Sequence, residues 1–180
     1  MSELNDTIAR WEAEEQAVLA RMSKETGWAR PEQVVGQPGI ALFDAISDGR
    51  LPRPPIGQTL DFLPILVTPG RAIFQGRPNP RHYNPMGGVH GGWFCTLLDS
   101  AVGCAVHSAL PAGKAYTTLE IKVNIVRGLT DRVPLVRAEG VTIHVGNQTA
   151  TAEGRLTGPD GKLYAHATTT CLVFDYPPKP

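Results

Sequence analysis

The chain has little that would mark it as a secreted, membrane-spanning or nucleic-acid-binding protein. Its 3 cysteines form neither an even disulfide framework nor a CxxC metal motif. Lysine plus arginine and aspartate plus glutamate number 17 each, so no net field attracts nucleic acid or an anionic membrane. No apolar run reaches the ~18 residues of a membrane span, and the first residues are acidic where a secretory signal is basic and apolar. We therefore expect a soluble, cytoplasmic protein with reduced cysteines.

The first part of the chain has helical patterns followed by a proline-rich segment. Apolar residues recur at helical spacing over residues 3–26, which predicts an amphipathic helix. A second, shorter helix is expected at residues 40–47. The prolines of residues 49–57 (GRLPRPPIG) are expected to exclude regular structure, so this stretch is interpreted as a structured lead-in to the next part of the chain.

Strand patterns begin at residue 60. Apolar runs at residues 60–67 and 71–75 flank a Thr-Pro-Gly turn, which predicts a hairpin. The strands of the C-terminal half are expected to pair consecutively as an antiparallel meander. After the strand at residues 116–127 come three more β-rich runs, separated by glycine-containing turns. They cover residues 133–145, 148–157 and 162–174. A long apolar helix followed by such strands predicts an α+β fold, in which the sheet curves around the helix.

Residues 116–127 (YTTLEIKVNIVR) alternate between apolar and polar side chains, which predicts a half-buried strand. The buried face is expected to hold four apolar residues, Leu119, Ile121, Val123 and Ile125. The opposite face is expected to hold four polar residues, Thr118, Glu120, Lys122 and Asn124. The alternation thus separates Thr118 from the apolar side chains of the same strand.

A single carboxylate, Asp99, interrupts the apolar helix that is predicted from Gly91 onward. Its neighbours one turn away, Cys95 and Gly103, are small. Loss of hydration in such surroundings disfavours the charged form, which raises the pKa and the basicity of the carboxylate. A structural aspartate with a hydrogen-bonding partner and a catalytic acid are equally compatible with this pattern.

The loop before this helix carries groups that could contact a ligand. Unpaired N–H groups at Gly91 and Gly92 can receive an oxyanion, although a tight loop-to-helix turn would use the same residues. The positive end of the helix disfavours protonated His90, which favours a structural or ligand-contacting neutral imidazole over a general base. Asn84 could donate to a substrate carbonyl or to water, or could cap a turn.

Together these residues resemble the hotdog-fold acyl-CoA thioesterases of the phenylacetate-degradation (PaaI-like) type. The resemblance is carried by Asn84-x-x-Gly87-x-x-His90-Gly91-Gly92 followed by Asp99, by residues 117–127 (TTLEIKVNIVR) and by residues 160–168 (DGKLYAHAT). It implies that residues 60–176 form a hotdog domain, a long central helix wrapped by a curved antiparallel sheet. Residues 1–59 would be an N-terminal helical extension and proline-rich lead-in, with residues 52–56 folded over the acyl pocket.

The resemblance also implies a role for each of these positions. Asp99 would act as nucleophile or as general base toward water, and the Gly91 N–H would polarise the thioester carbonyl. Asn84 would orient water or the carbonyl, and Thr118 would assist the acid, with Thr117 as the alternative if the register slips. Contacts with substrate or CoA are expected from seven residues, His90, Gly92, Val145, Gly146, Asn147, Gln148 and Thr149. Coenzyme A is part of the substrate, and no cofactor or metal is expected.

The spacing of the two principal groups has a geometric consequence. Eight residues separate Gly91 from Asp99, which is about 12 Å of helical rise. One carbonyl must lie ~3 Å from both its oxyanion donor and its attacking group. One chain therefore cannot easily supply both groups to one thioester. We expect a site shared between two protomers, which matches the dimer, often paired into a tetramer, that is usual in these thioesterases.

The predicted activity is hydrolysis of acyl-CoA thioesters to free acid and CoA. One alternative is an acyl-thioester hydratase or dehydratase on the same fold, although these enzymes usually pair a catalytic histidine with the acid in a different motif. The other is a non-catalytic acyl-CoA-binding protein, which has no need of a buried carboxylate. Cys95, one turn before Asp99, is interpreted as a packing residue rather than a thiol nucleophile.

Overall fold

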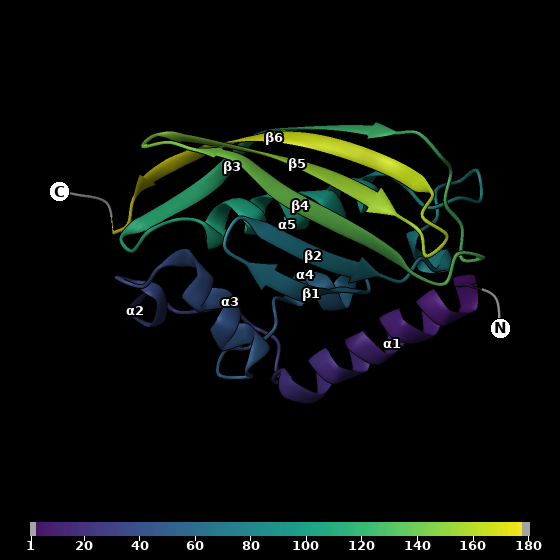
Figure 1. Cartoon of the computed structure of the whole chain (residues 1–180), viewed down its shortest axis with the longest axis horizontal. Coiled ribbons are helices and arrows are strands. Elements are labelled where there is room, and N and C mark those ends of the chain that lie inside the picture. Colours follow the sequence, from purple (N-terminus) through teal and green to yellow (C-terminus); the bar gives the residue numbers. More distant parts are fainter. Residues whose placement is uncertain (1–2, 178–180) are drawn as a thin grey trace.

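The computed structural model describes residues 3–177, and Figure 1 shows how its elements are arranged. The chain begins with a long helix, α1 (Glu3–Arg21), and three short helices, α2 (Pro31–Val34), α3 (Gly39–Ser47) and α4 (Pro55–Thr59). These helices lie on one side of a larger unit built from a sheet and the helix α5 (Gly91–Ser108) (Figure 1). None of the helices in residues 3–177 is long and apolar enough to cross a membrane.

Six strands form one sheet that curves over α5 (Figure 1). Their order in the sheet is β1-β2-β4-β5-β6-β3, and every neighbouring pair is antiparallel. The strands are β1 (Phe62–Thr68), β2 (Arg71–Gly76), β3 (Lys114–Ile125), β4 (Val136–Val145), β5 (Thr149–Thr157) and β6 (Leu163–Asp175). A short 3-10 helix, η1 (Pro80–His82), precedes the loop that leads into α5. The predicted hotdog arrangement is confirmed.

Helix α5 lies at the centre of the core because its apolar side chains face the sheet. Leu97, Leu98 and Val102 are fully buried, and each such side chain stabilises the fold by about 1.5–3 kcal/mol. The helix approaches the sheet closely at Gly140 of β4, where an added Cβ would lie 2.3 Å from the Ala101 carbonyl oxygen. Only glycine fits at that distance. This close approach fixes α5 against the sheet at Ala101, two residues after Asp99.

The observed elements follow the sequence patterns with two corrections in their organisation. The helices predicted in the N-terminal part correspond to α1 and α3, and the predicted strands correspond to β1 to β6. The proline-rich residues 49–57 do not exclude regular structure, because Pro55 begins α4, where its fixed φ and missing N–H suit the first helical position. The C-terminal strands are also not all paired in sequence order: β4, β5 and β6 form a meander, whereas β3 pairs with β6 at the far edge.

A β-bulge in β3 breaks the alternation predicted for residues 116–127. The pairing with β6 shifts register between Thr118 and Glu120, which leaves Leu119 as the extra residue. The assignments of Leu119 to the buried face and of Thr118 to the opposite face were wrong, since Leu119 is 60% exposed and Thr118 contacts α5. Ile125 is 46% exposed at the end of the strand but lies beside Gly91 of α5. The bulge turns Thr118 toward α5, on the same side as Ile121. A period of two residues cannot reveal such an insertion, because every residue after it changes face.

A buried carboxylate fastens α1 to the sheet. Glu15 is only 6% exposed and accepts hydrogen bonds from Arg77 Nη2 at 2.6 Å and from Gln75 Nε2 at 2.8 Å. On the same helix, the Trp11 ring lies 4.4 Å from the guanidinium carbon of Arg137. The N-terminal extension therefore packs directly on the hotdog domain through specific polar contacts.

Candidate active site

Asp99 lies on α5 and is joined to the edge strand β3. Thr118 Oγ1 donates a hydrogen bond of 3.2 Å to Asp99 Oδ1. Burial raises the pKa of the Asp99 carboxyl, and the hydrogen bond from Thr118 offsets part of this effect by favouring the ionised form. The structure thus brings together the two residues that were predicted to act as the acid and its assistant, whose roles remain predictions.

The other groups around Asp99 are not cations. Among residues 3–177, no lysine, arginine or histidine forms an ion pair with Asp99 within 4.0 Å. Burial, with a contribution from the charge of Asp99, raises the pKa of the Cys104 thiol to about 12. Burial likewise raises the pKa of Tyr116 well above its usual value. With pKa values raised in this way, the thiol and the phenol are uncharged at neutral pH and supply no charge that would compensate an ionised Asp99.

The two glycines at the start of α5 differ in whether their N–H groups are bonded within residues 3–177. The Gly92 N–H donates to His90 Nδ1 at 2.9 Å, so it is occupied within the loop. With Nδ1 accepting this bond, Nε2 is the ring nitrogen of His90 that is left to donate. The Gly91 N–H has no acceptor among the described residues 3–177. Of the two predicted amides, Gly91 is therefore the one available to an oxyanion.

Asn84 holds the turn that precedes this helix. Its Oδ1 accepts from the backbone N–H of Met86 at 2.9 Å and of Gly88 at 3.4 Å, and its own backbone N–H donates to Gly88 O at 2.8 Å. This is the turn-capping role that the sequence left open. The side-chain nitrogen of Asn84 has no acceptor within residues 3–177, so capping does not use its donor.

The structure does not bring Gly91 and Asp99 together within one chain. Gly91 lies beside Ile125 at the end of β3, since a Cβ added at Gly91 would be 3.3 Å from Ile125 Cδ1. Asp99 contacts Thr118, which is much nearer to the beginning of that strand. The separation along α5 therefore stands as the sequence predicted it, at about 12 Å.

The turn between β4 and β5, where CoA contacts were predicted, lies away from Gly91. The C-terminal part of β4 is near the last residue of α5, because Thr142 N–H donates to Gly70 O and the Gly70 N–H donates to Ser108 Oγ. Figure 1 shows this hairpin beyond that end of the helix. The predicted turn residues Val145, Asn147, Gln148 and Thr149 are exposed, whereas Gly146 is partly buried and its N–H is bonded to Thr149 O.

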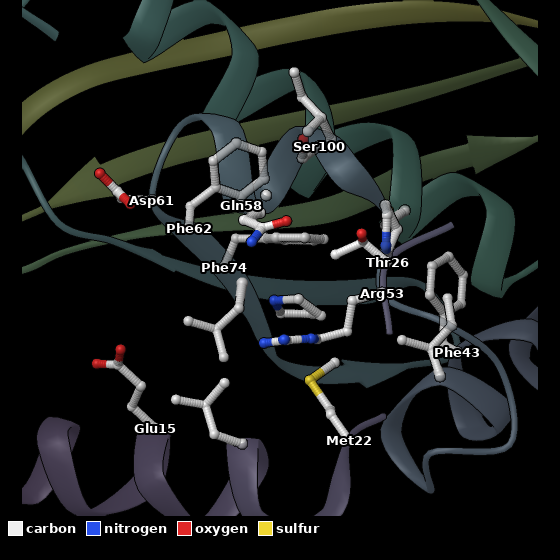
Figure 2. A pocket seen from close by; sticks show the side chains of 18 of the residues that line it. Glu15, Met22, Thr26, Phe43, Arg53, Gln58, Asp61, Phe62, Phe74 and Ser100 are labelled. Carbon is white, nitrogen blue, oxygen red and sulfur yellow. The ribbon is translucent and has the colours of Figure 1, made fainter. Parts of the chain in front are cut away.

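A cavity of about 410 Å³ connects the surroundings of Asp99 with the N-terminal helices. Figure 2 shows Ser100 of α5 at one end of it, and at the other Glu15 of α1 and Met22, which directly follows α1. Most side chains between these ends are apolar, among them Leu19, Phe43, Ile46, Phe62 and Phe74. A hollow of this size and lining is suited to a small, largely apolar ligand group.

Sequence reasoning found only part of this cavity. Residues 52–56 were expected to fold over an acyl pocket, and Arg53, Pro54 and Ile56 do line the cavity. The contributions of α1 and α3, such as Leu19 and Phe43, were not predicted. The periodicity of an amphipathic helix identifies its buried face but not the element or cavity against which that face packs.

The central part of this chain is similar to known proteins. Residues 86–165 match the family model described as the thioesterase superfamily. A candidate esterase of Pseudomonas aeruginosa is 34% identical over 94 residues, which are 52% of this chain. The chain spans 63% of the length of that curated relative.

Two solved structures resemble the chain in fold and in sequence. One is a candidate thioesterase from Ralstonia eutropha, described as related to phenylacetic acid degradation, with a TM-score of 0.66 and 27% identity over 72% of this chain and 98% of that one. The other is a mutant of the phenylacetic acid degradation protein PaaI from Thermus thermophilus, with a TM-score of 0.59 and 27% identity over 66% of this chain and 97% of that one. The predicted PaaI-like resemblance is confirmed.

Proposed function

We propose that this chain, whose residues 86–165 match the thioesterase superfamily, hydrolyses acyl-CoA thioesters to the free acid and CoA. The observation that carries the proposal is the state of Asp99, a half-buried carboxylate at the wall of a cavity, held by one hydroxyl and no cation within residues 3–177. An aspartate kept only for structure is normally paired or bonded by several donors, because an unpaired buried charge is costly. A carboxylate left reactive beside a ligand-sized cavity favours a catalytic role.

The ionised Asp99 would begin the reaction. In one route it attacks the thioester carbonyl carbon and expels the CoA thiolate, and water then cleaves the acyl-aspartate anhydride. In the other it takes a proton from a water molecule that attacks the same carbon. Both routes consume one water and yield one carboxylic acid and one CoA thiol. Thr118 supports either route, because its hydroxyl stabilises the ionised carboxylate.

The oxyanion donor is assigned to the Gly91 N–H of a second protomer. No strand within residues 3–177 pairs with the outer edge of β3, and Leu119 and Val126 on or just after this strand are 60% and 55% exposed. An apolar unpaired edge favours pairing with another chain. Antiparallel pairing of two β3 edges would set the start of one α5 opposite Asp99 of the other. We therefore propose a homodimer, or a tetramer of two dimers, with shared sites.

Substrate positioning is assigned to polar groups that remain available in the structure. The side-chain nitrogen of Asn84 can donate to the thioester carbonyl or to water. The Nε2–H of His90 can donate in the same region. The exposed tip of the β4–β5 turn, with Asn147 and Gln148, offers backbone amides to the phosphates of CoA. These assignments rest on the resemblance and on the N–H groups that each of these residues has available to donate.

The test is thiol release from a panel of aryl- and medium-chain acyl-CoAs. We expect saturable release that is lost in Asp99→Asn while folding and oligomeric state are retained. Saturable binding of CoA thioesters without thiol release would instead identify a non-catalytic binder. Addition of water to an enoyl-CoA without thiol release would identify a hydratase.

A further inference from the structure

One cationic side chain of the cavity wall has no acid beside it among residues 3–177. Arg53 lies between α3 and α4 in the proline-rich segment, and Figure 2 shows its guanidinium pointing into the cavity. Its Nε is buried and makes no hydrogen bond, and its Nη2 makes only a long bond of 3.5 Å to Lys24 O. Within residues 3–177, no carboxylate lies within 4.0 Å of the Arg53 nitrogens.

Apart from Asp99, the other charged residues of the cavity wall are already paired. Glu15 is bound by Arg77 at 2.6 Å, and Asp61 is bound by Arg81 at 2.6 Å. Neither acid is therefore left over to neutralise the guanidinium of Arg53. In the described part of the chain, Arg53 is the one cation of the cavity wall without an acid beside it.

The cavity wall thus carries an acid and a cation at different places, and these two groups are not paired with each other. Asp99 lies in the wall on α5, and Arg53 lies in the wall contributed by the extension. The lining around them is mostly apolar, with Phe62, Phe74 and Ile56 among its members. A guanidinium matches a carboxylate with two parallel hydrogen bonds, and an apolar surrounding strengthens such a pair. The ligand that fits this wall has an apolar middle and an anionic end.

We propose that the acyl group held in this cavity ends in a carboxylate, so that the substrates are CoA thioesters of dicarboxylic acids and Arg53 determines this specificity. The inference rests on the proposed thioesterase activity. The thioester carbonyl lies at Asp99, the methylene chain lies along Phe62 and Phe74, and the free carboxylate pairs with Arg53. Hydrolysis consumes one water and releases the dicarboxylic acid and CoA.

The residue proposed to determine substrate specificity and the residue proposed to catalyse hydrolysis lie in different parts of the chain. Asp99 belongs to the matched residues 86–165, whereas Arg53 belongs to the N-terminal extension. The extension is held on the domain by the Glu15–Arg77 pair, which keeps the segment of Arg53 against the cavity. Changing Arg53 is therefore expected to alter which acyl group is accepted while leaving Asp99 and Thr118 in place.

The experiment compares matched substrates on the full-length protein. Adipyl-CoA and hexanoyl-CoA, and likewise suberyl-CoA and octanoyl-CoA, differ only in the distal carboxylate. We expect wild-type kcat/KM to favour the dicarboxylic member of each pair, and the ratio to fall about ten- to a hundred-fold in Arg53→Gln, the size expected for one charge-assisted contact. The matched control is Arg50→Gln, because Arg50 is on the same segment, is 63% exposed and faces Asp48 instead of this cavity. It should leave the ratio unchanged.

A charge reversal gives an independent check. Arg53→Glu should lose the preference for adipyl-CoA and gain one for 6-aminohexanoyl-CoA, because the anionic side chain attracts a distal ammonium. Equal wild-type rates on both members of each pair would overturn the inference even if no variant folded, while thioesterase activity would still stand. Absence of thiol release from every substrate would instead reject the proposed function itself.

Discussion

Thr118 Oγ1 lies 3.2 Å from Asp99 Oδ1 and donates to it, so the edge strand β3 and the central helix α5 meet at this hydrogen bond. It is the one hydrogen bond to the Asp99 side chain within residues 3–177. Burial raises the pKa of Asp99 and the Thr118 hydroxyl lowers it. The balance between these two effects governs both the stability and the pH dependence of the site.

Asp99→Asn is expected to abolish thiol release, by at least about a hundred-fold, and to stabilise the fold. A pKa that is raised by folding means that ionised Asp99 opposes folding at pH values above that pKa. The difference in the free energy of unfolding between Asp99→Asn and wild type should therefore decrease as the pH falls through the pKa of Asp99. Urea denaturation at several pH values measures this. A variant less stable than wild type at neutral pH would show that Asp99 is a structural residue.

Thr118→Val is expected to shift the acidic limb of the kcat/KM profile to higher pH. Loss of the hydroxyl removes the contact that favours ionised Asp99, so the pKa of this carboxyl rises further. The control is Thr117→Val, since Thr117 is exposed and precedes the residue that contacts Asp99. An equal shift in both variants would assign the effect to the strand rather than to the hydrogen bond, and Thr118→Ser should restore the wild-type profile.

Cys95→Ser is expected to keep at least about half of wild-type kcat, because serine keeps the size of a side chain that only packs. Cys95 lies one turn before Asp99 on α5 but is not part of the cavity wall. Steady-state kinetics together with treatment by iodoacetamide at neutral pH measures the outcome. A loss of activity comparable with that of Asp99→Asn would make the thiol the nucleophile.

Glu15→Ala is expected to lower the free energy of unfolding by about 1–3 kcal/mol, less than a fully buried pair because Arg77 is partly exposed. The carboxylate is buried and bonded by both Arg77 and Gln75, and its loss leaves Gln75 Nε2 without that acceptor in the interior. Chemical denaturation measures the change. Glu12→Ala is the control, since Glu12 is exposed and 4.0 Å from Arg77. Equal losses in both variants would argue against a specific clamp.

The sequence predicted the fold well because its signals are local. The alternation of residues 116–127 and the apolar stripe of α5 each follow the period of one element, and both elements are present. The face of Leu119 could not be predicted, because a bulge is set by pairing with β6 rather than by the pattern of β3. The cavity depends on how α1 and α3 pack on the domain. The sequence therefore could not predict that Arg53 has no acid beside it within residues 3–177.

The role of Gly91 can be tested by removing its N–H alone. Gly91 is the first residue of α5, and His90 before it has φ −63° and ψ 138°. Proline is favoured at this helical position, and the extended backbone of His90 is compatible with a following proline. Gly91→Pro is therefore expected to fold and to lose at least about a hundred-fold in kcat. Gly91→Ala, which keeps the N–H, should retain most activity, and equal losses would point to a steric effect.

A purified heterodimer of Asp99→Asn and Gly91→Pro chains, made by co-expression with two affinity tags, tests most directly whether the active site is shared between protomers. Each homodimer should be inactive. In the heterodimer, one site combines the intact Asp99 of one chain with the intact Gly91 of the other, so we predict about half of wild-type activity per dimer. A stable heterodimer that releases no thiol would show that each chain supplies both groups to its own site.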